Sequence, residues 1–124
     1  MTIPVFHNFS SAPTHVAPFS HAVEFDGWVQ LTGQMPTDPI DDTKPLPDGI
    51  QAQTRRVMDN LEIILNEMQL GLENELSTWV NLTNFKRDYE PMNNIYKSYF
   101  AYDRLTRPYL RWNYRPASRC LGRQ

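Results

Sequence analysis

An apolar stripe between Ile50 and Met68 is the feature that most constrains the fold of this chain. Its members recur every three or four positions, the spacing that places side chains on one face of a helix. They are Ile50, Val57, Met58, Leu61, Ile64, Leu65 and Met68. Asp48 is a candidate cap for the start of this helix, and Gly71 suits a left-handed position just past its end. A helix of this kind has to bury its apolar face against another element.

Two short runs before the helix predict a sheet against which it can pack. His21–Phe25 and Trp28–Thr32 are strand-like, and the Asp-Gly pair between them suits the positive φ angles of a tight hairpin. Val23 and Phe25 alternate with their neighbours, so we expect these two side chains to face the core. The segment that follows, 35–49, holds four prolines and four aspartates, which predicts a surface loop.

The chain after the first helix predicts one more strand and one more helix. Residues 76–85 alternate in a strand-like way, and a second helix is indicated by Asp88 and by Pro91 in its first turn. The apolar face of this helix is formed by Met92, Ile95, Tyr96, Tyr99 and Phe100. The order ββαβα in 124 residues predicts a single α+β domain with helices packed on one face of a sheet.

Charge is divided unevenly along the chain. The stretch up to Asp103 holds all fourteen acidic residues and six of the twelve Lys and Arg, whereas the tail holds six arginines and no acid. A basic tail can indicate a nucleic acid or membrane partner. Here Trp112, Tyr114 and two prolines interrupt the arginines, so we expect neither partner.

Cysteine content and hydropathy indicate the compartment. Cys120 is the single cysteine, which permits no internal disulfide and favours a reducing environment. No apolar run approaches the roughly 18 residues that suggest a membrane span, and the N-terminal residues lack the pattern of a secretory signal. We therefore expect a cytoplasmic protein.

Searches for catalytic patterns in the residues find little. There is no glycine-rich phosphate loop and no nucleophile elbow. His7, His15 and His21 lack the spacing of metal ligands, and prolines interrupt the aspartates of 38–42, so we expect no metal. Residue patterns alone thus indicate a small α+β protein without a visible catalytic constellation.

Four motifs in uninterrupted order add to this interpretation. They read APFSHAV (17–23), WVQLTGQMPTDP (28–39), QTRRVMDNLEIIL (53–65) and VNLTNFKRDYEPMNNIYKSYF (80–100). Over roughly residues 12–105 the chain resembles the RidA/YjgF family. The resemblance implies a chorismate-mutase-like fold, with a mixed six-stranded sheet and two helices on one face. It also implies a homotrimer with active sites between subunits, which hydrolyses enamines and imines to 2-oxo acids and ammonia without a cofactor.

The resemblance implies candidate site residues one position at a time. Phe19 stands where many members have a pocket tyrosine, so the ring is kept and the hydroxyl is lost. Thr32 and Gly33 match a Ser-Gly pair, and Asn93 matches an asparagine of the second helix that faces the cleft. Each has an ordinary structural alternative: Phe19 as core, Thr32 as a strand hydroxyl, Gly33 as a bulge and Asn93 as an exposed helix residue.

The tail departs from the family pattern, in which an arginine binds the substrate carboxylate and a glutamate lies near the cleft. The family arginine aligns with Pro108, so the candidate Arg107 is one position early. A slip of one residue in a strand turns a side chain to the opposite face. No acid follows Asp103 to supply the glutamate. We therefore divide the chain into a RidA-like domain, 1–105, and an atypical Arg-rich tail, 106–124.

We hypothesise that this tail is a shifted reading frame of a normal family ending. With suitable codons, omission of one cytosine at Thr106-Arg107 converts the tail to TARTCVGITGLHRGALV followed by Asp or Glu. That text restores the family's arginine, strand and terminal acid in order. The alternative is a divergent tail in which the alternating residues 109–114 replace one strand.

Three functions are consistent with the sequence. The first is a hydrolytic deaminase of 2-imino acids, impaired in this chain by the altered tail. The second is a trimer that binds small 2-oxo acids in the same clefts without turnover. The third is RNA binding or ribonuclease activity through the arginines, which requires affinity that falls steeply with salt.

Overall fold

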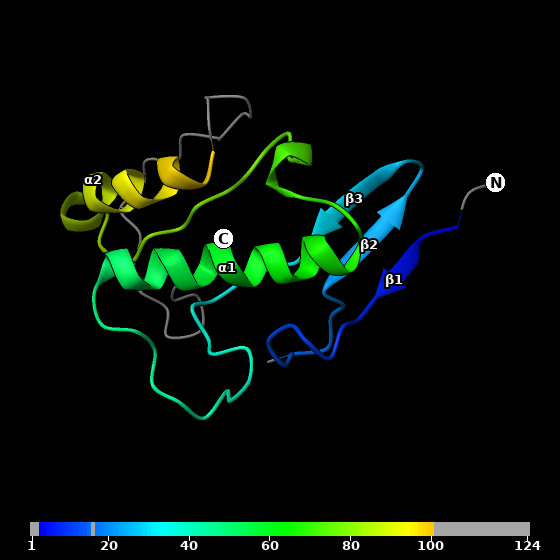
Figure 1. The fold of residues 1–124 in the computed structure, drawn as a ribbon, viewed down its shortest axis with the longest axis horizontal. Helices are drawn as coiled ribbons and strands as arrows, with labels where there is room; N and C mark the ends of the chain where they lie inside the picture. The colour runs from blue at the N-terminus through cyan, green and yellow to red at the C-terminus, as the bar shows by residue number, and fades with distance from the viewer. Residues whose placement is uncertain (1–2, 16, 101–124) are drawn as a thin grey trace.

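The computed structural model describes residues 3–15 and 17–100, which form an α+β fold (Figure 1). Its elements are β1 (Val5–His7), β2 (Ala22–Phe25), β3 (Trp28–Leu31), α1 (Ile50–Glu67), the 3₁₀ turn η1 (Leu72–Asn74), α2 (Phe85–Tyr96) and the 3₁₀ turn η2 (Lys97–Tyr99). None of the helices in these ranges is long and apolar enough to cross a membrane.

The sheet has three antiparallel strands in the order β1-β2-β3. The predicted hairpin is confirmed: Asp26 and Gly27 both have positive φ, 52° and 80°, and Phe25 pairs with Trp28 across the turn. β1 was not predicted, because three residues are too short to show alternation. Both ladders of this sheet are antiparallel, whereas the resemblance implied a mixed six-stranded sheet.

The two faces of the sheet differ from the prediction. Ala22 of β2 is buried, and with Val29 and Leu31 of β3 it packs on Ile64 of α1. The expectation that Val23 and Phe25 face the core is therefore wrong, because register places them on the face turned away from α1. That outer face also carries Phe6 and Trp28, which are 64% and 66% exposed.

Helix α1 confirms the apolar stripe, with Val57, Met58, Leu61, Ile64 and Leu65 all buried. The predicted cap is wrong: Gly49, at φ 84°, takes the cap position without a side-chain bond, so Asp48 lies one residue too early. The left-handed residue at the other end is Gln69, with φ 60°, rather than Gly71, whose φ of −138° is extended.

A Schellman motif explains why Gln69 takes that place. The backbone N–H of Leu70 donates to the carbonyl of Leu65 at 2.8 Å, and the N–H of Gln69 donates to the carbonyl of Asn66 at 3.0 Å. This pair of bonds requires a left-handed residue directly after the C-cap, Met68. These two backbone hydrogen bonds therefore determine which residue is left-handed, although glycine is the residue usually found at that position.

Helix α2 begins one turn earlier than predicted. The side-chain oxygen of Asn84 accepts a hydrogen bond from the backbone N–H of Arg87 at 3.2 Å and caps the helix. Pro91 consequently lies inside α2 and not in its first turn.

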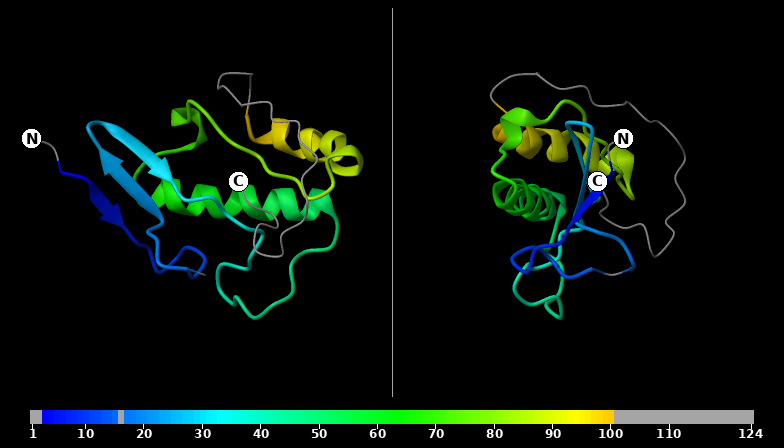
Figure 2. Two further views of the ribbon diagram at one scale, coloured as in Figure 1. Left: turned by 180° about the vertical axis from the view of Figure 1, so that it is seen from behind. Right: turned by 90° about the vertical axis from the view of Figure 1, so that its right-hand side faces the viewer.

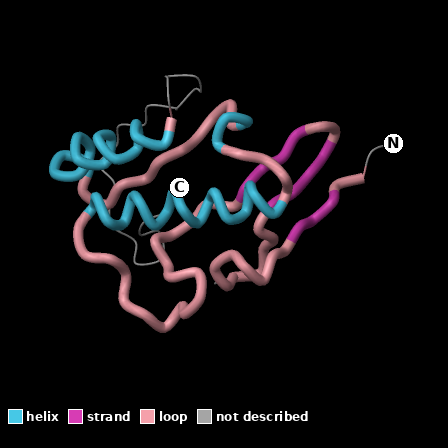
Figure 3. The backbone as a smooth tube through the Cα atoms, viewed as in Figure 1, coloured by secondary structure: helices cyan, strands magenta, loops and turns pink. Residues whose placement is uncertain are grey.

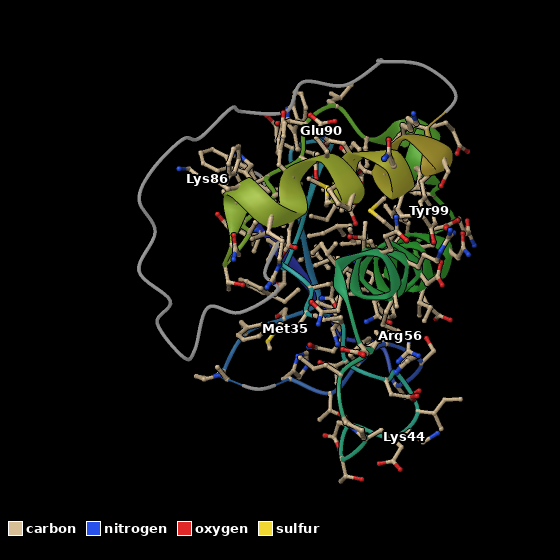
Figure 4. The ribbon with its side chains drawn as sticks, turned by 90° about the vertical axis from the view of Figure 1, so that its left-hand side faces the viewer. Met35, Lys44, Arg56, Lys86, Glu90 and Tyr99 are labelled. Carbon is tan, nitrogen blue, oxygen red and sulfur yellow. The ribbon has the colours of Figure 1, made fainter. Side chains whose placement is uncertain are left out.

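α2 lies beside α1 in both views of Figure 2. Lys86 and Glu90 are exposed and point outward from α2 in Figure 4.

Tyr96, Tyr99 and Phe100 at the end of this region pack against the buried cluster that includes Val57 and Leu61 of α1. The hydroxyl of Tyr99 also donates to a carboxylate oxygen of Asp59 at 2.9 Å. Burial, that bond and the negative charge of Asp59 raise the pKa of Tyr99 to about 12. The end of the described chain is thereby held against α1.

The strand predicted over residues 76–85 is not found in the described part of the chain. This segment runs as an irregular connection from η1 to α2, with one isolated bridge residue at Ser77 (Figure 3). A strand is defined by backbone hydrogen bonds to a neighbour, and none of the ladders between β1, β2 and β3 includes residues 78–84. Alternation of apolar and polar residues does not show whether a partner strand is present.

Candidate active site

A recess lies between the segment that precedes β2 and the segment that follows β3. It has a volume of about 30 Å³. Its lining residues are Pro13, Thr14, His15, Phe19, His21, Gly33, Gln34, Met35 and Thr37. A water molecule needs roughly 10–15 Å³ of such space, so the recess of one chain has room for about two or three waters.

Backbone and side-chain bonds hold both walls of the recess in place. The backbone N–H of Thr32 donates to the carbonyl of His21 at 3.0 Å, and the hydroxyl of Thr32 donates to the carbonyl of Ser20. On the far side, the fully buried amide of Asn60 donates to the carbonyls of Met35, at 3.0 Å, and Thr37, at 2.9 Å. Figure 4 shows Met35 on the loop below α1.

The loop beyond Thr37 is tied to α1 by Asp38. One carboxylate oxygen accepts backbone N–H groups of Ile40, at 2.9 Å, and Asp41, at 3.0 Å. The other lies 3.5 Å from the guanidinium of Arg56 and 3.8 Å from the amine of Lys44, both labelled in Figure 4. Hydrogen bonds from Asp41 and Ile40, with smaller effects of the two cations, lower the pKa of Asp38.

Asp38 and Asp41 are therefore engaged with their own loop. Asp41 accepts hydrogen bonds from both the hydroxyl, at 2.5 Å, and the backbone N–H, at 3.0 Å, of Thr43, which lower its pKa. Among the residues that the structure describes, no three His, Cys, Asp or Glu side chains come together in a metal-binding arrangement.

Two histidines of the recess have different surroundings. His21 is 4% exposed, and its Nδ1 accepts the backbone N–H of Phe9 at 3.0 Å. Its Nε2 therefore carries the proton and donates to the carbonyl of Pro13 at 2.7 Å. His15 lies with its ring centroid 4.2 Å from that of His21 and 5.7 Å from that of Phe19. The Nδ1 of His15 is buried and has no hydrogen-bond partner among the residues that the structure describes.

The structure brings together some of the predicted site residues. Phe19 and Gly33 both line the recess, and Thr32 lies directly before Gly33 with its hydroxyl bonded to Ser20. Asn93 lies on α2 and does not line the recess. Its side-chain oxygen is buried and has no hydrogen-bond partner in the described part of the chain. Arg107 lies outside the described residues.

Sequence reasoning missed the parts played by His15, Gln34 and Asn60. His15 was considered only as a metal ligand; it stands four residues before Phe19 and just outside the family motif that begins at residue 17. Gln34 is 5% exposed and its amide donates to the carbonyl of Thr32 at 3.3 Å. Asn60 interrupts an apolar stripe, and a buried amide at such a position is a signal of a backbone clamp.

The fold and the recess define a small α+β protein whose candidate site lies beside the end of a hairpin. Residues 9–122 match the model of a protein family described as Endoribonuclease L-PSP. A RutC family protein of Aquifex aeolicus is 34% identical over 89 residues, which cover 72% of this chain and 69% of the relative. The chain belongs to the RidA/YjgF family, which this family model describes.

Further relatives agree with this assignment. The mouse protein named 2-iminobutanoate/2-iminopropanoate deaminase is 31% identical over 91 residues, covering 73% of this chain and 66% of the mouse protein. The crystal structure of yeast Mmf1 has a TM-score of 0.76 at 26% identity, covering 86% of this chain and 82% of Mmf1. RidA from an Antarctic Psychrobacter shares the fold, with a TM-score of 0.76 at 24% identity. The match covers 86% of this chain and 84% of that RidA.

Proposed function

We propose that this protein is a hydrolytic deaminase that converts 2-imino acids to 2-oxo acids and ammonia. The observation that carries the proposal is the placement of Phe19 and Gly33, both identified through the family motifs, on the walls of one recess. Family membership and the name of the mouse relative support the same reaction class. The partner is thus a small 2-imino acid, and the reaction consumes water with no cofactor.

The chemistry required of such a site is modest. The imine carbon is already electrophilic, so the protein has to orient the substrate and place a water beside that carbon. The water oxygen bonds to the carbon, the C=N electron pair moves to nitrogen, and the resulting carbinolamine collapses to the C=O product and ammonia. A recess with room for about two or three waters beside an aromatic wall supports this step.

We also propose that the active protein is a cytoplasmic homotrimer in which neighbouring subunits complete each site. A volume of about 30 Å³ is small for a whole imino acid. The outer face of the sheet carries Phe6, Phe25 and Trp28, which are 64%, 45% and 66% exposed in the single chain. An apolar face of this kind on a sheet supports association between copies.

Activity is expected to be weaker in this chain than in an intact relative. The family arginine aligns with Pro108, and no acid follows Asp103. An arginine fork binds a carboxylate through two parallel hydrogen bonds, and Arg107, one position early, is no equal substitute. A rate equal to that of the mouse deaminase would contradict this expectation.

The proposed function can be tested on adjacent residues of α2. Imines are generated in situ from amino acids by an amino-acid oxidase, and ammonia release is measured for the unsubstituted chain, Asn93→Ala and Asn94→Ala. We expect Asn93→Ala to lose activity, because its buried side-chain oxygen has no partner within residues 3–15 and 17–100. Asn94 is exposed on the same helix and is the matched control. Equal rates for all three would remove Asn93 from the site.

Binding without turnover is the second candidate. Phe19 lacks the hydroxyl that the resemblance implies for this position, so the recess wall offers one polar group fewer. This candidate predicts saturable binding of small 2-oxo acids with no acceleration of ammonia release. Calorimetry and the ammonia assay on the same preparation distinguish the two functions.

Ribonuclease activity is the third candidate, and the description of the family model is what favours it. The six arginines of the tail would then bind RNA phosphates. This candidate predicts RNA affinity that falls steeply with salt and is lost when the chain is truncated at Asp103.

A further inference from the structure

A buried side chain outside the recess holds the backbone of one of its walls. Asn60 of α1 does not line the recess, yet its amide donates hydrogen bonds to the carbonyls of Met35, at 3.0 Å, and Thr37, at 2.9 Å. Backbone carbonyls only accept hydrogen bonds, so the nitrogen of the amide has to face this segment. Pro36 lies between the two carbonyls, is fully buried, and has a φ angle fixed by its ring. The segment 35–37 is therefore held on both sides of a rigid residue.

A second contact between α1 and this wall comes one helical turn earlier. Arg56 and Asn60 are four residues apart, which places them on the same face of α1. The guanidinium of Arg56 lies 3.5 Å from a carboxylate oxygen of Asp38, the residue directly after Thr37. The other carboxylate oxygen of Asp38 accepts two backbone N–H groups of its own loop. One face of α1 thus holds the wall and the start of the loop that continues from it.

The opposite wall is held by the end of the hairpin. The backbone N–H of Thr32 donates to the carbonyl of His21 at 3.0 Å, and the hydroxyl of Thr32 donates to the carbonyl of Ser20. His21 belongs to the segment before β2 that lines the recess. The width of the recess is therefore set by how α1 holds residues 35–37 relative to the hairpin. A misplacement of about 1 Å in a site of this kind can cost ~10²-fold in rate.

We infer that Asn60 is a positioning residue for the 2-imino acid, because it fixes, together with the contact between Arg56 and Asp38, the wall against which the substrate binds. This inference rests on the proposed deaminase function. Loss of the amide leaves the carbonyls of Met35 and Thr37 without this donor, and the segment then has to move toward solvent to hydrate them. The substrate has to order the displaced wall when it binds, which weakens its affinity.

The test compares Asn60→Ala with Leu65→Ala. Both side chains are buried on α1 and neither lines the recess, so both substitutions should lower stability. The apolar side chain of Leu65 donates no hydrogen bond to the wall. Urea unfolding gives the folded fraction of each variant at the assay temperature. A smaller folded fraction lowers the apparent kcat and leaves KM unchanged, whereas a displaced wall raises KM.

We expect Asn60→Ala to raise the KM for 2-iminobutanoate about tenfold, and Leu65→Ala to leave it within about twofold of the unsubstituted chain. The Kd of 2-oxobutanoate, measured by calorimetry, should rise by a similar factor in Asn60→Ala, since this product keeps the carboxylate and the side chain of the imine. Equal KM and Kd values in the two variants overturn the inference and leave the proposed function standing.

The binding measurement separates the inference from the proposed function, because it does not depend on turnover. The unsubstituted chain could bind 2-oxobutanoate without releasing ammonia. Weaker binding by Asn60→Ala than by Leu65→Ala would then overturn the deaminase function and keep Asn60 as the positioning residue of a binding site. An unsubstituted chain that neither releases ammonia nor binds 2-oxobutanoate overturns both.

A milder variant decides the question if Asn60→Ala does not fold. Asp38→Ala removes the carboxylate that Arg56 contacts, at a position on the loop where the fold should tolerate it. We expect it to weaken 2-oxobutanoate binding by about two- to fivefold, the size of one ion pair near the surface. Asp42→Ala, at an exposed position of the same loop, is the matched control. Equal affinities for these two variants overturn the inference.

Discussion

Asn60 of α1 donates hydrogen bonds from its buried side-chain amide to the backbone carbonyls of Met35 and Thr37, which belong to the segment lining the recess. The two distances are 3.0 and 2.9 Å, and Asn60 has no exposed surface. Because α1 also packs on the sheet through Ile64, one helix positions both the hairpin and the recess wall. The stability of the fold and the shape of the site are therefore linked through this residue.

Asn60→Ala should destabilise the protein by about 2 to 4 kcal/mol. The substitution removes two hydrogen bonds, leaves two carbonyls without donors and opens a small cavity. Urea unfolding followed by circular dichroism measures the change. Asn66→Ala, at an exposed position on the same helix, should change stability by less than about 0.5 kcal/mol. Equal effects at the two positions would contradict the clamp.

Glu75 makes stability depend on pH. Burial raises the pKa of its carboxyl from the ordinary 4.5 to about 7. The folded protein thus holds this proton more tightly than the unfolded chain, so stability falls as pH rises from about 4.5 to about 7 and is level above that. The fall should be about 1 to 2 kcal/mol, reduced from the full shift because the side chain is only partly buried.

Glu75→Gln should remove this component of the pH dependence. Urea unfolding at pH 5, 6, 7 and 8 gives the difference between the variant and the unsubstituted protein, which should grow between pH 5 and 7. Glu73→Gln, at an exposed neighbouring position, is the control. A difference that stays constant across this range at Glu75 would show that the carboxyl titrates alike in the folded and unfolded chains.

Trp28→Lys should shift the protein from the proposed trimer to a monomer. Trp28 lies on the outer face of the sheet and is 66% exposed in the single chain, so a charge there would be buried on association. Light scattering coupled to size-exclusion chromatography measures the mass. Ile40→Lys is the control, since Ile40 is 95% exposed on the loop and away from that face. A monomeric unsubstituted protein would contradict the trimer itself.

The source gene across codons 104 to 110 tests the origin of the tail. We expect one spurious cytosine at the Thr106-Arg107 join, because its removal restores a family-like ending. The restored protein should release ammonia faster than the present chain, since it regains the arginine and the terminal acid. A gene that encodes the frame as printed would instead establish the arginine-rich tail as native.

Much of the fold could be predicted from the sequence where local signals were strong. The Asp26-Gly27 hairpin and the apolar stripe of α1 are both found, because turn geometry and helical periodicity act over a few residues. The predictions failed where residues distant in the sequence determine which face is buried or whether a strand finds a partner. Val23 and Phe25 face outward because α1 packs on Ala22, and residues 78–84 alternate like a strand without a ladder in the described chain.

The site was predicted in part for the same reason. Phe19 and Gly33 were found through motifs, and their convergence on one recess depends on the hairpin that joins β2 to β3. The Nδ1 of His15 has no partner among the described residues, a feature that could not be found from sequence because it exists only in three dimensions. Asn60 likewise became interpretable once the carbonyls of Met35 and Thr37 lay beside it.

The initial rate of ammonia release from 2-iminobutanoate, with and without the protein, tests the central claim most directly. The amino-acid oxidase that forms the imine is present in both mixtures, so the uncatalysed rate is recorded alongside. Hydrolysis at the recess predicts faster release with the protein, at a rate below that of the mouse deaminase. Equal rates with folded protein and without it would contradict the assignment of this chain as an imine deaminase.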